Sequence, residues 1–390
     1  MREGWEYKKL GEVASSELGK TLNKSKDTGK LYPYICAVNV LWDMIDLTIL
    51  KHAFFEKEEI DRYSVRKGDL LVCEGGDTGR SAIWEKEEPI LYQNALHRVR
   101  FTTEMEARFA MYCLWHLKNN GQIDQKYSKG VTIKHLVKSS LLSIELPVPP
   151  LSTQLSIVSE LDKINELIRL KKEQLKDYDN LAQSIFYEMF GDPVVNEKGW
   201  EVKKLGEVAM IKTGPFGSML HKEDYITGGI PLINPMHIQN FKAVPDKDFS
   251  ISKEKAAELC NYQLKINDVI FARRGDIGRC AVISDKEAGC LCGTGSLFVR
   301  FERKLSSIYT MYVVRTTSFI KELVSKAKGA TMLNLNSSTM ENLRFPIPPL
   351  PLQQLFAQRI ELIEQQKDEI KSTIADLKTL LASRMQYWFD

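Results

Sequence analysis

Two stretches of the chain, residues 151–190 and 352–390, carry apolar side chains at alternating steps of four and three residues and contain neither Gly nor Pro. Counted from Ile157, nine of ten such positions in the first stretch are apolar, and eight of ten are apolar from Phe356 in the second. Apolar residues every 3.5 positions over several heptads are typical of a coiled coil. The pattern therefore predicts two long helices.

A helix of this length spans roughly 55 Å at ~1.5 Å per residue, which is more than the width of a 150-residue domain. Such a helix needs a partner beyond its own domain, and the other long helix of the chain is the obvious one. We expect an antiparallel pair with a globular domain at each end. The polar seam residues Lys171 and Lys367 lie near the middle, where they help to set the register. The alternative is a pair of amphipathic helices that each pack on their own domain.

The rest of the chain is a repeat. Residues 4–14 return as residues 199–209 and differ only at Tyr7 and Val202. Further along, a Gly-Asp-x-Gly-Arg segment and a Pro-x-Pro-Pro-Leu segment each recur 199 positions later. The second copy therefore carries four extra residues between 209 and 266. Residues 21–50 and 213–241 share little, which indicates one task performed twice on two different targets.

Each globular copy predicts a mixed α+β domain. Short apolar runs at 69–73 and 268–272 predict buried strands that enter turns, and residues 107–118 and 308–318 predict helices. Proline closes each domain, because it removes a ladder donor and restricts the preceding residue. The expected parts are a first globular domain, a long helix, a second globular domain and a second long helix, with an internal pseudo-twofold repeat: 1–150, 151–192, 193–349 and 350–390.

Composition adds little to this picture. The formal net charge is only +3, so nucleic-acid binding would have to rest on local clusters of basic residues. The start of the chain has no apolar signal segment, no run approaches the length of a membrane span, and the seven cysteines lack zinc-site spacing. We expect a cytoplasmic protein with reduced thiols, no membrane contact and no metal site.

Motifs for catalysis are missing from the sequence. Residues Asn234 to His237 come nearest to the Asn/Asp-Pro-Pro-aromatic element of an adenine methyltransferase, but they lack the second proline and the aromatic residue. No strand is followed by a glycine-rich dinucleotide or nucleotide-phosphate fingerprint. The sequence therefore predicts a chain with no catalytic residues and no cofactor of its own.

The order of these parts resembles the specificity subunit of type I restriction–modification enzymes. The resemblance covers the whole chain and rests on the Gly-Trp-Glu-x-Lys-Lys-Leu-Gly-Glu-Val-Ala openings, residues 213–220, the Gly-Asp-x-Gly-Arg turns, the proline hinges followed by a Gln-containing helix, and the Phe-Gly-Asp helix end at 190–192. The first copy departs at residues 18–23, so we expect its recognition loop to be built differently.

The resemblance implies a function. Each domain would read one half of a split, asymmetric site in double-stranded DNA, while the helices fix the spacing and dock two methyltransferase subunits. Those partners would bind S-adenosylmethionine and methylate adenine, and motor–nuclease subunits would add cleavage that depends on ATP and Mg²⁺. Two alternatives stay open: the specificity part of a related fused or type II-like system, and a coiled-coil scaffold that binds protein instead of DNA.

Candidate DNA contacts are basic residues in the glycine-containing loops and near the domain ends. Lysines there suit phosphates, and arginines also reach guanine edges. A solvated surface charge is the alternative for each of them. The candidates are Lys20, Lys24, Lys26, Arg80, Lys126, Lys129, Lys212, Arg273, Arg274, Arg279, Lys326 and Lys328.

Overall fold

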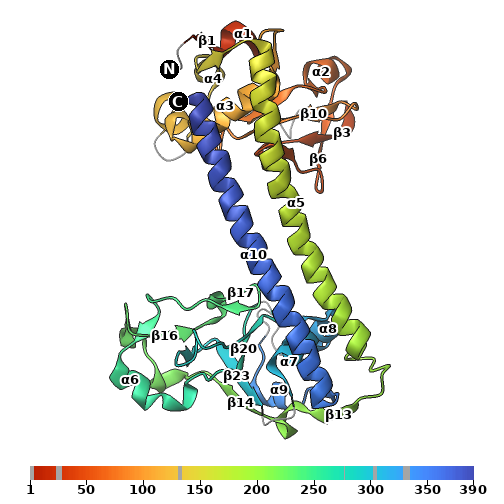
Figure 1. The fold of residues 1–390 in the computed structure, drawn as a ribbon, viewed down its shortest axis with the longest axis vertical. Helices are drawn as coiled ribbons and strands as arrows, with labels where there is room; N and C mark the ends of the chain where they lie inside the picture. The colour runs from red at the N-terminus through yellow and green to blue at the C-terminus, as the bar shows by residue number, and fades with distance from the viewer. Residues whose placement is uncertain (1–3, 23–28, 131–133, 276, 302–304, 328–333) are drawn as a thin grey trace. The chain divides into compact units, whose positions relative to one another are not determined.

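The protein forms two compact units in a computed structural model that describes residues 4–22, 29–130, 134–275, 277–301, 305–327 and 334–390. The first unit comprises residues 1–173 and 371–390, and the second comprises residues 174–370. Each unit holds one globular domain and parts of both long helices, α5 (Leu151–Phe190) and α10 (Leu350–Phe389). Figure 1 shows α5 in yellow-green and α10 in blue, and each passes from one unit into the other.

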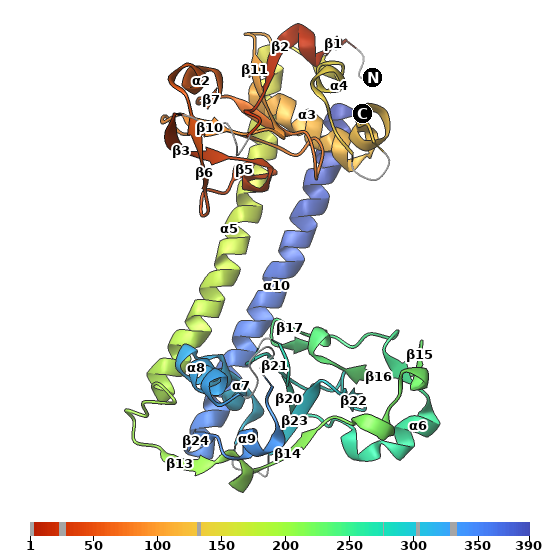
Figure 2. The same ribbon diagram turned by 180° about the vertical axis from the view of Figure 1, so that it is seen from behind.

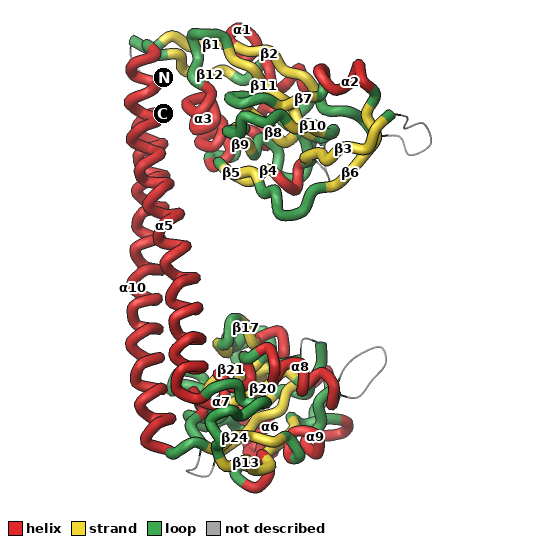
Figure 3. The backbone as a smooth tube through the Cα atoms, turned by 90° about the vertical axis from the view of Figure 1, so that its right-hand side faces the viewer, coloured by secondary structure: helices red, strands yellow, loops and turns green. Residues whose placement is uncertain are grey.

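An antiparallel four-stranded sheet lies at the centre of the first domain. Helix α3 (Ala107–Asn119) lies between this sheet and the long helices, as Figure 3 shows. A second sheet carries a separate small core, and its order is β6 (Lys51–Phe55), β3 (Lys30–Ile35), β10 (Ile90–Tyr92) and β7 (Ser64–Val65). All residues of the central strand β8 are buried, which explains its continuous apolar sequence. The order of the central sheet is β2 (Ala14–Leu18), β11 (Leu96–Phe101), β8 (Leu70–Cys73) and β9 (Ser81–Ile83).

The second domain repeats this topology, which confirms the repeat in the sequence. A short strand, β15 (Tyr225–Ile226), has no counterpart among the described residues of the first domain and lies in the region predicted to hold the extra residues. Figure 2 shows this domain from behind, with its central sheet beside helix α7 (Ser307–Arg315). The order of the central sheet is β14 (Ala209–Thr213), β23 (Ser296–Phe301), β20 (Val269–Ala272) and β21 (Cys280–Val282).

The repeated opening and the proline segment of each copy form a two-stranded ribbon. Strand β1 (Glu6–Lys9) pairs antiparallel with β12 (Glu145–Val148), and β13 (Glu201–Lys204) pairs with β24 (Arg344–Ile347) in the same way. A two-stranded ribbon has free edges, where the missing N–H of proline costs no ladder bond. The ribbon brings the entrance of each domain next to the start of the long helix that follows.

The bounds of the long helices agree with the periodicity. Helix α5 has the predicted span, and Gly191 follows it with a φ of 72°, a conformation that ends helices and favours glycine. Helix α10 begins at Leu350, two residues before the predicted start. Pro351 is tolerated there because the N–H groups in the first turn of a helix have no acceptor within the helix, so the missing N–H of proline costs no hydrogen bond.

Contacts between the helices confirm the antiparallel pair. In the second unit, Lys367 Nζ donates to Asp179 Oδ1 at 2.8 Å, and the rings of Phe356 and Phe190 lie 5.3 Å apart. Positions thus rise along α5 as they fall along α10. In the first unit, Trp388 Nε1 donates to Glu160 Oε2 at 3.0 Å. The seam residue Lys367 therefore makes an ion pair across the helices, as a register-setting residue should.

The buried stripe of each helix drifts from the predicted 3.5-residue spacing near the helix ends. Phe186 and Phe190 are buried where the pattern placed Ile185 and Met189. A straight helix has 3.6 residues per turn, so residues at a strict heptad spacing change their angular position on the helix surface by ~20° with each heptad. At their ends the helices also pack on globular domains, which selects these neighbouring positions.

A buried glutamine fixes the start of each long helix to the domain before it. Gln154 Oε1 accepts the N–H of Glu106 at 2.8 Å, and its Nε2 donates to the carbonyl of Pro149 at 2.8 Å. Gln353 makes the matching bonds to Ser306 and Pro348, each at 2.7 Å. The Gln-containing start of each helix is therefore a structural clamp.

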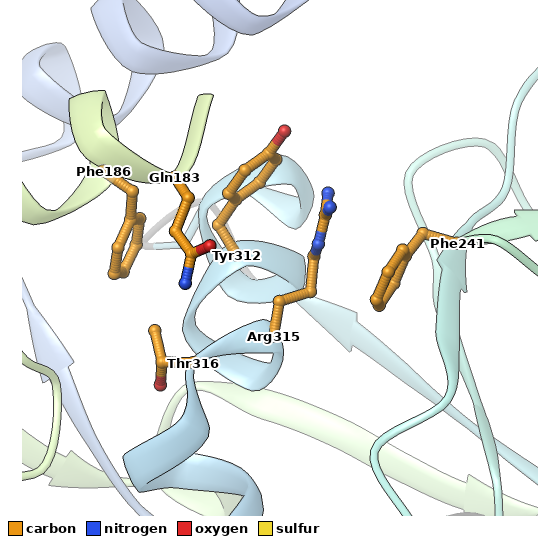
Figure 4. A pocket seen from close by; sticks show the side chains of 6 residues that line it. All are labelled: Gln183, Phe186, Phe241, Tyr312, Arg315 and Thr316. Carbon is orange, nitrogen blue, oxygen red and sulfur yellow. The ribbon is translucent and has the colours of Figure 1, made fainter. Parts of the chain in front are cut away.

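Matched side-chain stacks hold a hairpin of each domain near the helix at its core. In the second domain the Arg315 guanidinium lies 4.0 Å from the Phe241 ring centroid and 4.6 Å from that of Tyr312, beside a cavity of about 200 Å³ (Figure 4). In the first domain Trp115 takes the middle position that Arg315 has in the second, and its ring stacks on those of Trp42 and Tyr112. A cation–π stack and an aromatic stack thus perform the same packing role.

One predicted helix is wrong in its extent. Residues 308–318 were expected to form one helix, but the chain forms α7 and then α8 (Thr317–Lys326). The break lies at Thr316, whose side chain accepts the N–H of Phe319 and caps the second helix. None of the helices in the described ranges combines the length and apolar character that a bilayer span requires.

Candidate DNA interface

The Gly-Asp-x-Gly-Arg segment of each domain lies at a turn after the central strand, and Asp276 of the second segment lies outside the described residues. Gly79 and Gly278 adopt φ values of 83° and 100°. A side chain on Gly79 would also lie 3.0 Å from Ile123, so both conformation and space require glycine there. The turn is closed by a backbone bond from Cys73 N–H to the carbonyl of Arg80 at 2.8 Å, and Ala272 and Arg279 make the same bond at 2.9 Å.

Three segments meet at this turn in both domains, and we call their arrangement the turn frame. It comprises residues 74–75, 95 and 135–136 in the first domain, and residues 273–274, 295 and 334–335 in the second. In the first domain, Glu74 N–H donates to Ala95 O at 2.9 Å, and Leu136 N–H donates to Glu74 O at 2.7 Å. Gly75 forms an antiparallel bridge with His135. The backbone frame is thus independent of the side chains that it carries.

The second domain repeats the turn frame with different side chains. Arg273 N–H donates to Gly295 O at 2.9 Å, Leu335 N–H donates to Arg273 O at 2.9 Å, and Arg274 forms a bridge with Asn334. Leu136 and Leu335 are both fully buried at matching places. A fixed frame with exchanged side chains is the arrangement expected of a recognition surface.

The predicted arginines lie at this frame. The Arg80 Nη2 group donates to Ala37 O at 2.9 Å and is half-buried, as is Arg279. Arg274 is exposed. Burial, followed by the neighbouring charge of Arg274, lowers the pKa of Arg273 below its usual value.

Asp77 helps to fix the turn of the first domain. Its carboxylate lies 3.0 Å from Lys118 Nζ, which also contacts Asp124 at 3.0 Å. Thr78 Oγ1 donates to Asp124 at 2.7 Å. The second domain has the buried Ile277 at the place of Thr78, so apolar packing contributes to its turn.

The predicted lysines divide into surface and interior positions. Lys126, Lys129 and Lys326 are exposed, and Lys326 forms an ion pair with Glu322. Lys129 exchanges two backbone bonds of 2.8 Å with His135, which places it next to the turn frame. Lys24, Lys26 and Lys328 lie outside the described residues.

Two lysines are held by contacts within the protein. Lys20 is 7% exposed, and its Nζ donates to Phe54 O at 2.8 Å and to Glu59 Oε2 at 2.7 Å. This placement favours a structural role for Lys20 and not the phosphate contact that the sequence suggested. Lys212 is half-buried, with its Nζ 4.8 Å from the ring centroid of Tyr262.

Sequence reasoning missed His135 and Asn334, which complete the turn frame. Neither residue belongs to a motif, and neither is charged like the residues selected as candidates. Only their position could have indicated them, because each directly precedes a buried leucine, Leu136 or Leu335, that occupies the same place in the two copies. Within the part of the chain that the structure describes, no cluster of three or more His, Cys, Asp or Glu side chains is suited to hold a metal ion.

Comparisons with known proteins agree with this architecture. The chain is 25% identical over 381 residues to the MjaIX type I restriction enzyme specificity subunit of Methanocaldococcus jannaschii, with 90% of this chain and 85% of the relative covered. It is 21% identical over 348 residues to the EcoBI specificity subunit of Escherichia coli, with 80% and 70% covered.

Solved structures show the same fold. A type I restriction–modification S subunit from M. genitalium matches 99% of this chain and 96% of its own length, with a TM-score of 0.56 and 16% identity. A chain from a study of type I complex assembly and conformational transition matches 99% and 97%, with a TM-score of 0.62 and 19% identity. The model of the type I restriction modification DNA specificity domain matches twice, at residues 2–177 and 197–378. With two such matches over most of its length, the chain belongs to the family of type I restriction–modification specificity subunits.

Proposed function

We propose that this chain reads a bipartite, asymmetric site in double-stranded DNA, with one half read by each globular domain. The observation that carries the proposal is the turn frame, whose backbone bonds recur in both domains while its exposed side chains differ. Two readers of one design with different side chains suit two different half-sites. The basic residues at or near the frame, Arg80, Arg274, Arg279 and Lys129, are suited to phosphate and base contacts.

The long helices would set the spacing between the half-sites and dock two methyltransferase subunits. Support comes from apolar side chains on one exposed face of α10. Leu355 and Leu362 are seven residues apart, as are Leu380 and Tyr387, and their exposed fractions are 43%, 63%, 46% and 55%. Since 18 residues make five turns, all four lie along the same face. Each pair forms an exposed apolar group on α10, one in the second unit and one in the first, and exposed apolar groups of this kind mark protein interaction sites.

Catalysis would reside on the partner subunits. S-adenosylmethionine would bind to the methyltransferase subunits, and ATP and Mg²⁺ would act on the motor–nuclease subunits. The chain itself would then transfer no methyl group to DNA when assayed alone, and addition of the methyltransferase subunits would restore transfer.

Exchange of one domain tests the proposal. We expect replacement of residues 15–145 by the matching segment of a related specificity subunit to change one half of the methylated sequence. The other half should persist, because the second domain packs on its own clusters of buried residues. Genome-wide mapping of methylated adenines in a host with the partner subunits gives both halves and the gap. Simultaneous change in both halves would contradict the two-reader proposal.

Replacement of Lys129 tests the phosphate contacts. We expect Lys129→Ala to weaken binding to all DNA sequences alike and to lower the slope of log K against log salt by about one unit, because one fewer counterion is released. Titrations at several salt concentrations measure the slope. Lys326→Ala, which removes a lysine near the end of the second domain, is the comparison, and a smaller change is expected there because Lys326 already forms an ion pair with Glu322. An unchanged slope for Lys129→Ala would remove this residue from the interface.

A further inference from the structure

The turn frame of the second domain fixes the orientation of an asparagine amide. Arg273 Nε donates to Leu335 O at 3.1 Å, and its Nε and Nη2 atoms each lie 3.4 Å from Asn334 Oδ1. A guanidinium has no acceptor, so Asn334 must turn its oxygen, and not its NH₂ group, toward Arg273. Two Nδ2–H donors therefore remain, and the described residues offer them no acceptor.

The neighbouring residue adds further donors. Arg274 is exposed and is bridged through its backbone to Asn334, so the two residues share one place on the surface. No carboxylate of the described residues lies within ion-pair distance of its guanidinium. The adjacent charges of Arg273 and Arg274 oppose each other, and a ligand that brings acceptors relieves this repulsion. Among the described residues, the side chains of Arg274 and Asn334 thus offer hydrogen-bond donors at this place on the surface.

We propose that Arg274 and Asn334 form a base-reading pair that selects guanine in the half-site of the second domain, with Arg273 as the positioning residue. In the major groove guanine offers two acceptors, N7 and O6, whereas adenine and cytosine each present an amino donor. Asparagine can pair with adenine through both its oxygen and its nitrogen, but Arg273 already occupies Asn334 Oδ1. Guanine, which offers two acceptors where thymine offers O4 alone, is therefore the base that best complements the donors of Arg274 and Asn334.

The first domain carries the same frame without an arginine at these places. Glu74 and Gly75 stand where the second domain has Arg273 and Arg274, and His135 stands in place of Asn334. Glu74 has acceptors only, which complement the amino group of cytosine or adenine. The two domains are thus expected to select different bases through one frame, which would make the target asymmetric.

The test rests on the proposed function and uses the full chain in complex with its methyltransferase subunits, after the target has been mapped. Each guanine of the second half-site is replaced in turn by 7-deazaguanine, which lacks the N7 acceptor. We expect one position to lower the affinity by about 5- to 150-fold, the range of a good bidentate contact. Arg274→Ala should cause a comparable loss on the native duplex and make that guanine insensitive to the replacement.

Asn334→Asp provides a second variant with almost unchanged shape. The aspartate still accepts from Arg273 but replaces the outward donors by acceptors, so the guanine preference should fall while the fold is retained. Glu74→Gln is the matched control, because it should change the first half-site only. The triple variant E74R/G75R/H135N should bring guanine selection to the first half-site. Gly75 can accept a side chain, because its φ is not positive and its nearest neighbour is the His135 ring, 3.4 Å from the added Cβ.

Three results would overturn the base-reading pair. They are a second half-site without guanine, a complex insensitive to every 7-deazaguanine, and an equal loss on all duplexes for Arg274→Ala, which would indicate a phosphate contact. A wild-type complex that methylates DNA without any sequence preference would instead refute the proposed function itself.

Discussion

Phe356→Ala should lower the stability of the second unit by about 3–5 kcal/mol, the usual loss for a large aromatic side chain removed from a core. Phe356 is fully buried, and its ring centroid lies 5.7 Å from that of Phe186, 5.3 Å from Phe190 and 5.0 Å from Tyr312. These rings come from both long helices and from α7. The substitution therefore loosens the helix pair and its attachment to the domain together.

The size of this loss is large compared with the ~5–15 kcal/mol by which domains are stable. For a unit of this length the midpoint of thermal unfolding should fall by about 6–20 °C. Leu355→Ala is the matched control, because Leu355 is the neighbouring residue and is 43% exposed, so its loss should stay within about 0.5 kcal/mol. Calorimetry of both variants decides the matter. Equal midpoints for the two would show that the aromatic cluster does not anchor the helices.

Much of the fold follows from the sequence, because its strongest signals are long and repeated. The heptad pattern predicted α5 with its observed bounds, and the repeat predicted the shared topology of the two domains. The break at Thr316 was not foreseen, because a single side chain that caps the next helix decides it. Local capping of this kind leaves no periodic signal.

The candidate interface was less predictable, because charge alone does not tell where a side chain points. Arg274 lies on the surface as expected, whereas Lys20 is drawn inside by Glu59 and the carbonyl of Phe54. Asn334 is placed by a backbone bridge to a segment sixty positions earlier in the chain. Only the fold brings such distant segments together. The sequence therefore indicated basic residues next to the turn frame but did not indicate Asn334 or His135.

Lengthening both long helices should have the largest effect on target choice. We expect a complex with seven residues inserted after Glu173 and seven after Ile370 to lose binding at the native target. These points lie at the borders of the two compact units, so the contacts inside each unit are retained. Seven residues add ~10 Å of helix, which corresponds to about three base pairs at ~3.4 Å each. At ~10.5 base pairs per turn, the second half-site would also be rotated by nearly a third of a turn.

The methylome of the variant distinguishes the possible outcomes. A target with both halves unchanged and a gap longer by about three base pairs, or complete loss of methylation at the native gap, agrees with helices that set the spacing. Insertion of seven residues in α5 alone is the control, because it shifts one helix by two turns against the other and should destabilise the pair. Methylation of the native target at the native gap by the doubly extended protein would contradict the spacing role, since ~10 Å of added helix would then have left the distance between the half-sites unchanged.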